Sequence, residues 1–306
     1  MVQVLFRRLL QLIPVLWGIV TIVFLLQRLI PGSPADIVLG PDAPESQKLA
    51  WLERYGFKDP ILSQYGQFML GILQGDFGRS FATYQPVVEI ILPRLGVTFL
   101  LAISAFVFSL VVATIVGVYS ASQAGHLGDK IAAVLSLLAI SAPTFIIGPI
   151  FLWFFSVKLG WLPLLGNEGP LSFVLPTITL GSALAAFSSR MIRSGIVDVL
   201  GEDFIRTARS KGLAPTQVLV HHALRNAFLP TLTVLGMQLG VLMSGTVITE
   251  QIFSWPGLGS LTLQSVQARE YNIVSGCVIV MAIVFVVSNL CVDILYRVFD
   301  PRVRLT

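Results

Sequence analysis

Charged residues are scarce in this chain of 306 residues. Lys and Arg number 20 and Asp and Glu 16, so 12% of the sequence is charged and 55% is apolar. A soluble domain carries about 25% charged residues, because its exterior must be ionised. A disordered chain needs polar and charged residues too, to avoid collapse. The shortage of charge therefore excludes both classes and predicts an integral membrane protein.

Residues that carry chemistry are also few. Cys277 and Cys291 lie in one expected helix, about 21 Å apart along its axis, which is beyond the reach of a disulfide. The three histidines, His126, His221 and His222, fall outside every long apolar run. No Gly-Lys dipeptide occurs, so a P-loop is absent, and so are the HExxH and GxSxG patterns. We expect no enzyme activity, no metal or cofactor, and no nucleic-acid partner.

Six apolar stretches are long enough to cross a bilayer, which takes about 20 residues in a helix. They are 9–30, 97–121, 131–156, 172–192, 229–250 and 273–297. Pro143 and Pro149 should bend the third stretch. Barrel strands would alternate in polarity instead, so the expected fold is all-α with six transmembrane helices. Arg7 and Arg8 imitate a secretory signal, but no small-residue cleavage site follows, and we expect a retained span.

The basic residues are distributed unevenly between the expected loops. With the N-terminus inside, the short outside loops hold only Lys158 and Arg269, whereas the inside segments hold most of the rest. Cytoplasmic loops carry an excess of Lys and Arg, and long loops are exempt from this bias. We therefore expect both termini in the cytoplasm.

Two polar segments set the expected organisation. The boundaries are 1–30 for the N-terminus and first span, 31–96 for an external loop, 97–297 for the core and 298–306 for a cytoplasmic tail. Within the external loop we expect helices over 43–55 and 62–73 and a turn over 75–80. This loop is either an ordered cap or a docking surface for an extracytoplasmic partner.

The second polar segment, 193–228, lies within the core on the cytoplasmic side. Acidic Asp203 precedes basic Arg209, an order that suits a helix dipole. Gly212 stands where a helix would end, and Pro215 follows it. A second short helix is expected over 216–226. The segment thus predicts a short amphipathic helix projecting from the membrane, with an ordinary positive-inside loop as the alternative.

The stretch Arg206-Thr207-Ala208-Arg209-Ser210-Lys211-Gly212 resembles the EAA motif of ABC-importer permeases, and most closely that of the dipeptide, oligopeptide and nickel subfamily. Ala208 and Gly212 match the second Ala and the Gly of the motif. Arg206 and Thr207 stand at the positions of its Glu and first Ala. Further stretches that resemble this subfamily are 6–34, 75–80, 229–230, 253–259 and 300–304.

The resemblance implies a type I ABC-importer permease in a bacterial inner membrane, surrounded by lipid. Its partners would be a homologous second permease, two ATP-hydrolysing subunits and an extracytoplasmic solute-binding protein. The resemblance places ATPase coupling on a short cytoplasmic helix. The coupling residues would be Arg206, Thr207, Ala208, Arg209, Lys211 and Gly212.

Two further groups of residues are candidates for the transport path. An aromatic turn on the outer side would form a gate or contact the binding protein, through Phe253, Trp255, Pro256 and Gly257. Polar side chains inside membrane helices mark pathways, although Ser and Thr also serve as packing contacts between helices. The candidates for lining the pathway are Gln238, Ser244, Thr246 and Thr249.

The expected substrate is a short peptide. A nickel chelate, glutathione or an opine-type solute would suit the same architecture. Two other classes, an ion channel and an intramembrane hydrolase, remain as alternatives of a different kind.

Overall fold

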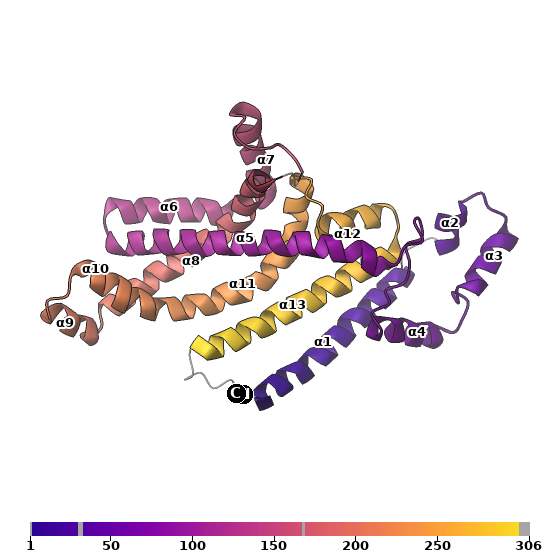
Figure 1. The fold of residues 1–306 in the computed structure, drawn as a ribbon, viewed down its shortest axis with the longest axis horizontal. Coiled ribbons are helices and arrows are strands. Elements are labelled where there is room, and N and C mark those ends of the chain that lie inside the picture. The colour runs from indigo at the N-terminus through magenta and orange to yellow at the C-terminus, as the bar shows by residue number, and fades with distance from the viewer. Residues whose placement is uncertain (1, 30–32, 167–168, 300–306) are drawn as a thin grey trace. The chain divides into compact units, whose positions relative to one another are not determined.

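The computed structural model describes residues 2–29, 33–166 and 169–299, and these are mostly helical (Figure 1). The described residues form no β-strand, and a single isolated bridge joins Arg79 to Pro86. Two of the helical segments, η1 and η3, are π-helical, and η2 is a 3₁₀ helix. In chain order the elements are α1 (Val2–Leu29), α2 (Pro34–Leu39), α3 (Glu45–Arg54), α4 (Ile61–Leu73), α5 (Val87–Ser122), α6 (Leu127–Ser141), α7 (Thr144–Phe151), η1 (Leu152–Lys158), η2 (Pro170–Phe173), α8 (Val174–Leu200), α9 (Asp203–Ser210), α10 (Pro215–Gln217), η3 (Val218–Leu224), α11 (Arg225–Ile252), α12 (Leu258–Gln267) and α13 (Tyr271–Phe299).

Four helical stretches in the described chain are long and apolar enough to span a membrane. A fifth is added if α6 and the following α7–η1 segment count as one bent span. The bend between them is 104° and falls at Pro143, as the sequence predicted. The four stretches are Leu10–Leu29, Val87–Ser122, Pro170–Leu200 and Tyr271–Cys291.

The expected span over 229–250 lies inside the continuous helix α11. Several of its side chains fall outside the described residues, so a sixth span stays a prediction. Two boundaries differ from the expectation. Helix α5 begins at Val87 instead of residue 97, with Glu89 in its first turn, where a negative charge suits the helix dipole. The helix expected over 216–226 runs without a break into α11 as α10 and η3.

The packing of the chain divides it into two compact units. The first is Met1–Val97 with Gly257–Val284, and the second is Thr98–Pro256 with Phe285–Thr306. The segments expected from sequence, 1–30, 31–96, 97–297 and 298–306, describe how the chain would cross the membrane. The two units describe only which parts pack together, so those segments stay predictions.

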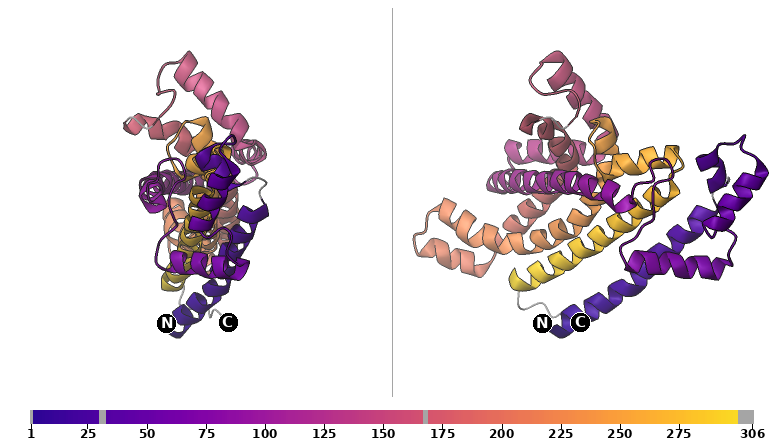
Figure 2. Two further views of the ribbon diagram at one scale, coloured as in Figure 1. Left: turned by 90° about the vertical axis from the view of Figure 1, so that its right-hand side faces the viewer. Right: turned by 45° about the vertical axis from the view of Figure 1, so that its right-hand side comes forward.

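In the first unit, the loop expected to be external is mostly helical. Helices α3 and α4 confirm the two helices predicted there, and α2 is an additional one. Helix α4 lies beside α1, where Phe68, Met69 and Ile72 pack around Val20 and Val23 (Figure 2). The loop is thus an ordered helical structure.

In the second unit, α8 is the central helix and packs against both α6 and α11 (Figure 1). Its contact with α5 depends on two glycines. A Cβ at Gly117 would lie 2.8 Å from Ile192, and one at Gly181 would lie 2.7 Å from the carbonyl oxygen of Ala105. Small residues let membrane helices approach closely in this way. Helix α8 continues directly toward α9, the expected coupling helix.

Candidate functional site

Helix α9 ends in a Schellman motif, which fixes where the coupling segment turns. The N–H of Gly212 donates to the carbonyl of Arg209 at 2.9 Å, and the N–H of Leu213 donates to the carbonyl of Ala208 at 3.4 Å. Gly212 has a φ of +79°, the left-handed conformation that favours glycine. A Cβ at Gly212 would meet nothing within 4 Å. The glycine is therefore needed for backbone conformation, as the expected helix end requires.

The buried face of α9 attaches it to the rest of its unit. Ile205 and Ala208 pack with Val218 of η3 into a small apolar cluster, which Leu200 and Leu213 complete. Ala208 is buried within this chain, so its small side chain has a packing role here that is independent of any partner. The cluster holds the helix in place although α9 has only eight residues.

The opposite face of α9 is exposed and mixed in character. Arg206 pairs with Asp203 one turn earlier at 2.7 Å, but both side chains are largely exposed, so the pair adds little stability. Thr207, Arg209 and Lys211 are also exposed. Phe204 is not among the predicted coupling residues, yet its ring is 45% exposed on the flank of this polar face. An exposed aromatic ring on an anchored helix is the kind of feature that docks into a partner's groove.

The segment after α11 is turned by the same backbone motif. The N–H of Trp255 donates to the carbonyl of Glu250 at 2.7 Å, and that of Ser254 donates to Gln251 at 3.4 Å. Ser254 takes the left-handed position with a φ of +51°. The motif directs Trp255 inward, where its indole lies edge-on to Phe173 with ring centroids 4.5 Å apart.

All four predicted gate residues have little exposure. Phe253 and Trp255 are 3% and 0% exposed, Gly257 is buried and Pro256 is half-buried. The carbonyl of Phe253 accepts a hydrogen bond from the N–H of Gly166 at 3.1 Å. The indole nitrogen of Trp255 is buried and finds no hydrogen-bond partner among the described residues, an arrangement that costs free energy unless something compensates.

The predicted pathway residues lie along α11 without forming one cluster. Thr246 and Thr249 are fully buried, and the part of the chain that the structure describes offers the hydroxyl of Thr249 no hydrogen-bond partner. Gln238 is half-buried, and the side chain of Ser244 lies outside the described residues. The acidic side chain nearest to them is Glu250, which is fully buried and accepts a hydrogen bond from Thr98 Oγ1 at 2.6 Å. Which of them face substrate stays a prediction.

An ion pair between a buried carboxylate and a half-buried guanidinium joins the start of α6 to α8, and nothing in the sequence pointed to it. Asp129 accepts from Arg193 Nε and Nη2 at 2.6 Å each, and also from Ser120 Oγ and the N–H of Gly125. The two partners are 64 residues apart, so no local spacing could reveal them. The pair holds α6 against the part of α8 that leads to α9.

A buried carboxylate organises the 75–80 turn of the first unit. Glu270 accepts hydrogen bonds from Ser80 Oγ, from the N–H of Phe81 and from that of Ala82, at 2.7 to 3.0 Å. Asn272 donates to the carbonyl of Arg79 at 2.8 Å. Within the predicted turn, Gly75 and Gly78 adopt φ of +76° and +81°. The residues that brace its C-terminal end, Glu270 and Asn272, come from a distant segment. Among the described residues, no group of three or more His, Cys, Asp or Glu side chains could hold a metal ion.

Comparison with known proteins identifies the family. Residues 113–305 match the model described as "Binding-protein-dependent transport system inner membrane component", and residues 1–102 match the model of its N-terminal region. The chain is 38% identical over 305 residues to the glutathione transport system permease protein GsiC of Salmonella typhimurium LT2, covering 99% of both chains. The GsiC of Escherichia coli K12 is 36% identical over 304 residues, again covering 99% of both.

Solved structures agree on the fold. A methionine ABC transporter, MetNI, in an inward-facing conformation aligns with a TM-score of 0.55 at 17% identity, over 70% of this chain and 97% of that one. An amino acid ABC transporter aligns with a TM-score of 0.52 at 17% identity, over 71% of this chain and 95% of that one. Both have the type I importer permease fold predicted from sequence. The chain thus belongs to the family of inner-membrane permease components of binding-protein-dependent transport systems.

Proposed function

We propose that this permease forms half of the translocation pathway for short peptides in an ATP-driven importer. Support comes from the full-length similarity to permeases of glutathione transport systems, since glutathione is itself a tripeptide. The partners would be a homologous second permease, two ATP-hydrolysing subunits and an extracytoplasmic solute-binding protein. Both termini would face the cytoplasm of a bacterial cell.

The observation that carries the coupling role is the construction of α9. The helix is anchored through Ile205 and Ala208 and ended by Gly212, so its exposed face is presented as a rigid unit. A force applied to that face would reach α8 through Leu200, which packs on the same cluster. ATP-driven closure of the partner subunits could then move the spans as rigid bodies. Thr207, one turn on from Phe204, would lie beside the docked ring, and Arg206, Arg209 and Lys211 would contact the partner from other exposed sides of the segment.

The coupling role is tested with the assembled transporter in lipid vesicles. Phe204→Ala should lower the ATPase stimulation by substrate-loaded binding protein at least tenfold, because a central aromatic contact contributes about 2 kcal/mol or more. The matched control is Ser210→Ala, on the same helix and also exposed, which should keep full stimulation. Full stimulation in Phe204→Ala would exclude this helix face as the coupling contact.

The substrate is tested by uptake into cells that lack their own peptide importers. Cells with the complete transporter should accumulate labelled glutathione or dipeptides, and an excess of unlabelled short peptide should abolish the uptake. Competition by nickel ions but not by peptides would contradict the peptide assignment. Flux through the purified chain without the ATPase subunits would contradict the importer itself and favour a channel.

The gate role of the Phe253–Gly257 region is part of the same proposal. The complete burial of Trp255 supports a gate that closes by packing, rather than a direct contact with the binding protein. The Trp255→Ala variant removes the contact with Phe173 and should raise basal ATPase activity without substrate, since the closed arrangement would be lost. Unchanged basal and stimulated activities would contradict the gate.

A further inference from the structure

A basic cavity opens between α5, α6 and α8 in the second unit. Its volume is about 630 Å³, and its charged lining residues are Asp129, Lys130, Arg190 and Arg193. The cavity lies where α5 ends and α6 begins, at the end of α8 that continues toward α9. It is separate from every gate, pathway and coupling residue described above.

The charges of this cavity do not cancel. The carboxylate of Asp129 is fully engaged by Arg193, Ser120 and Gly125, which neutralises one arginine. Lys130 and Arg190 remain, both exposed. Neither forms a salt bridge with any side chain that the structure describes. The cavity therefore carries two uncompensated positive charges beside a neutral, rigid ion pair.

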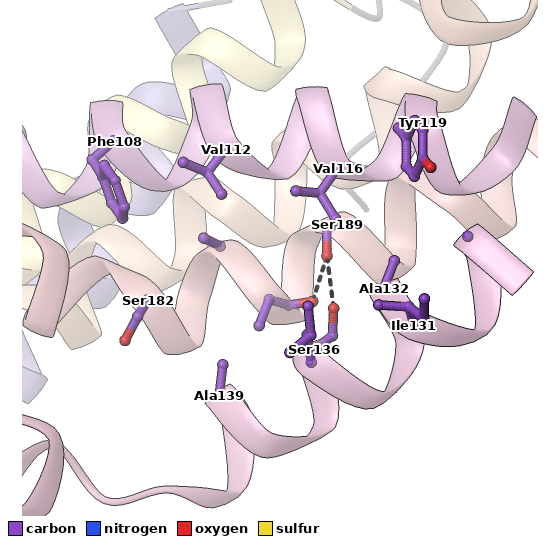
Figure 3. Close-up of a pocket in the computed structure, with 14 residues that line it drawn as sticks. Phe108, Val112, Val116, Tyr119, Ile131, Ala132, Ser136, Ala139, Ser182 and Ser189 are labelled. Atoms are coloured by element: carbon purple, nitrogen blue, oxygen red, sulfur yellow. Dashed lines mark hydrogen bonds between the residues drawn. The ribbon is translucent and has the colours of Figure 1, made fainter. Parts of the chain in front are cut away.

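An apolar groove of about 430 Å³ continues from this cavity along the same three helices. The two share Val116, Ala132, Ser136 and Ser189 as wall residues. Figure 3 shows the groove between α5 and the facing helices, from Phe108 at one end to Tyr119 at the other. Ser136 and Ser189 bond to each other at 3.4 Å, and Ser189 also donates to a backbone carbonyl. The hydroxyls of the three serines that line the groove, Ser136, Ser182 and Ser189, are therefore engaged within the chain.

We propose that the cavity and groove together bind one anionic phospholipid. The phosphate would lie between Lys130 and Arg190, and an acyl chain would lie in the groove toward Phe108. The site is basic at the helix ends and apolar toward their middles. It therefore complements an anionic lipid whose acyl chain runs parallel to the helices. Basic pockets between membrane helices are known to take lipid head groups. Tyr119 stands at the junction, the level that tyrosine favours at a membrane interface.

A lipid fits these features better than a peptide or a partner helix does. A short peptide offers a backbone full of polar groups, which an apolar groove with engaged serines could not satisfy. A packed helix would fill the groove but would leave Lys130 and Arg190 without an anion. Lipid binding does not depend on the proposed substrate or coupling role, and lipid retention is measured without any transport assay.

The first experiment is native mass spectrometry of the assembled transporter taken from bilayers of phosphatidylglycerol and phosphatidylethanolamine. Wild type should retain phosphatidylglycerol selectively. The double variant Lys130→Gln/Arg190→Gln should lower its affinity roughly 30-fold, as expected for two basic side chains. The matched control, Arg54→Gln/Lys58→Gln, removes two exposed charges elsewhere and should leave retention unchanged. Equal retention in the two double variants would overturn the proposal.

The second experiment tests the groove separately from the charges. Ala139→Phe fills the groove and should also reduce phosphatidylglycerol retention, whereas Val134→Phe on the exposed side of the same helix should not. Retention that survives Ala139→Phe, or binding of soluble glycerol phosphate equal to that of the lipid, would reduce the site to a phosphate site and refute a lipid. Efficient crosslinking of an Ala139→Cys variant to the second permease would assign the groove to a subunit interface and also refute it.

Discussion

At the scale of single residues, the ends of α9, α11 and α12 share one backbone motif and differ in the residue that occupies it. Gly212, Ser254 and Arg269 all adopt a positive φ after α9, α11 and α12. In each motif the next N–H bonds back into the helix, which turns the chain sharply. The turn buries Trp255 after α11 and directs Glu270 to the 75–80 turn after α12. The backbone conformation at each helix end thus sets the direction of these side chains.

The end of α9 should tolerate only residues that accept the left-handed region. Gly212→Val should destabilise the coupling segment by about 1–2 kcal/mol, the usual cost for a side chain with a Cβ there. Gly212→Asn should be nearly neutral, because asparagine visits this region readily and open space surrounds the position. Hydrogen exchange of residues 203–213 and stimulated ATPase activity report the difference. Equal hydrogen exchange and equal stimulated ATPase activity in the two variants would mean that the left-handed conformation at residue 212 is not required.

The link between α2 and α3 should depend on pH at both extremes. Lys48 lies 2.8 Å from Asp36, which lowers the pKa of that carboxyl and raises the pKa of the lysine. The contribution of Asp36 to the stability of this link is fully present above the unfolded pKa of the carboxyl. It is lost as the pH falls through the lower pKa of the folded state. The contribution of Lys48 to the stability of this link is fully present below the unfolded pKa of the lysine. It is lost as the pH rises through the higher pKa of the folded state.

Asp36→Asn should therefore increase hydrogen exchange over residues 33–55 at neutral pH and remove the acid-side change. Glu53→Gln is the control, because it removes only the exposed pair with Lys58 and should have little effect. An unchanged acid-side transition in Asp36→Asn would show that another group is responsible.

At the scale of elements, α8 connects most of what the second unit does. It packs on α5 through Gly117 and Gly181, is tied to α6 by the Asp129–Arg193 pair, and leads into α9. Movement of the coupling helix would therefore be carried to α5 and α6 through close, rigid contacts. Tight packing transmits displacement because interiors compress little.

The glycine contact between α5 and α8 gives a direct test of this rigidity. Gly181→Ala would place a methyl group 2.7 Å from the carbonyl oxygen of Ala105, so the helices must move apart. We expect a loss of about 1–3 kcal/mol in stability. Gly96→Ala, in open space on α5, should be neutral or slightly stabilising. Thermal unfolding in detergent compares the two, and equal melting temperatures would contradict the close contact.

At the scale of the whole molecule, the orientation in the membrane is a prediction from charge that can be tested directly. In a variant with Cys277→Ala and Cys291→Ser, a new cysteine replaces exposed Ser63 on α4 or exposed Ser210 on α9. A membrane-impermeant maleimide added to spheroplasts should label Ser63→Cys alone, because Lys and Arg concentrate on the cytoplasmic side. Labelling of Ser210→Cys from outside would invert the topology.

Sequence patterns were informative wherever a property is local. The bend at Pro143, the helix end at Gly212 and the helices α3 and α4 were all predicted, since each depends on neighbouring residues. The early start of α5 and the continuity of α10, η3 and α11 were missed. In both cases residues that suit a loop extend a helix, because an unbroken helix keeps its backbone hydrogen bonds paired.

The amino-acid sequence by itself determined that this is a helical membrane protein with a short helix ending at Gly212, because hydrophobic length and helix-end signals act locally. The tertiary structure alone decided which charges are neutralised, as with Asp129 and Arg193, and which are left uncompensated, as with Lys130 and Arg190. It also decided that Trp255 is buried and Phe204 exposed. Pairing and burial depend on residues far apart in the chain, and only folding brings those residues together.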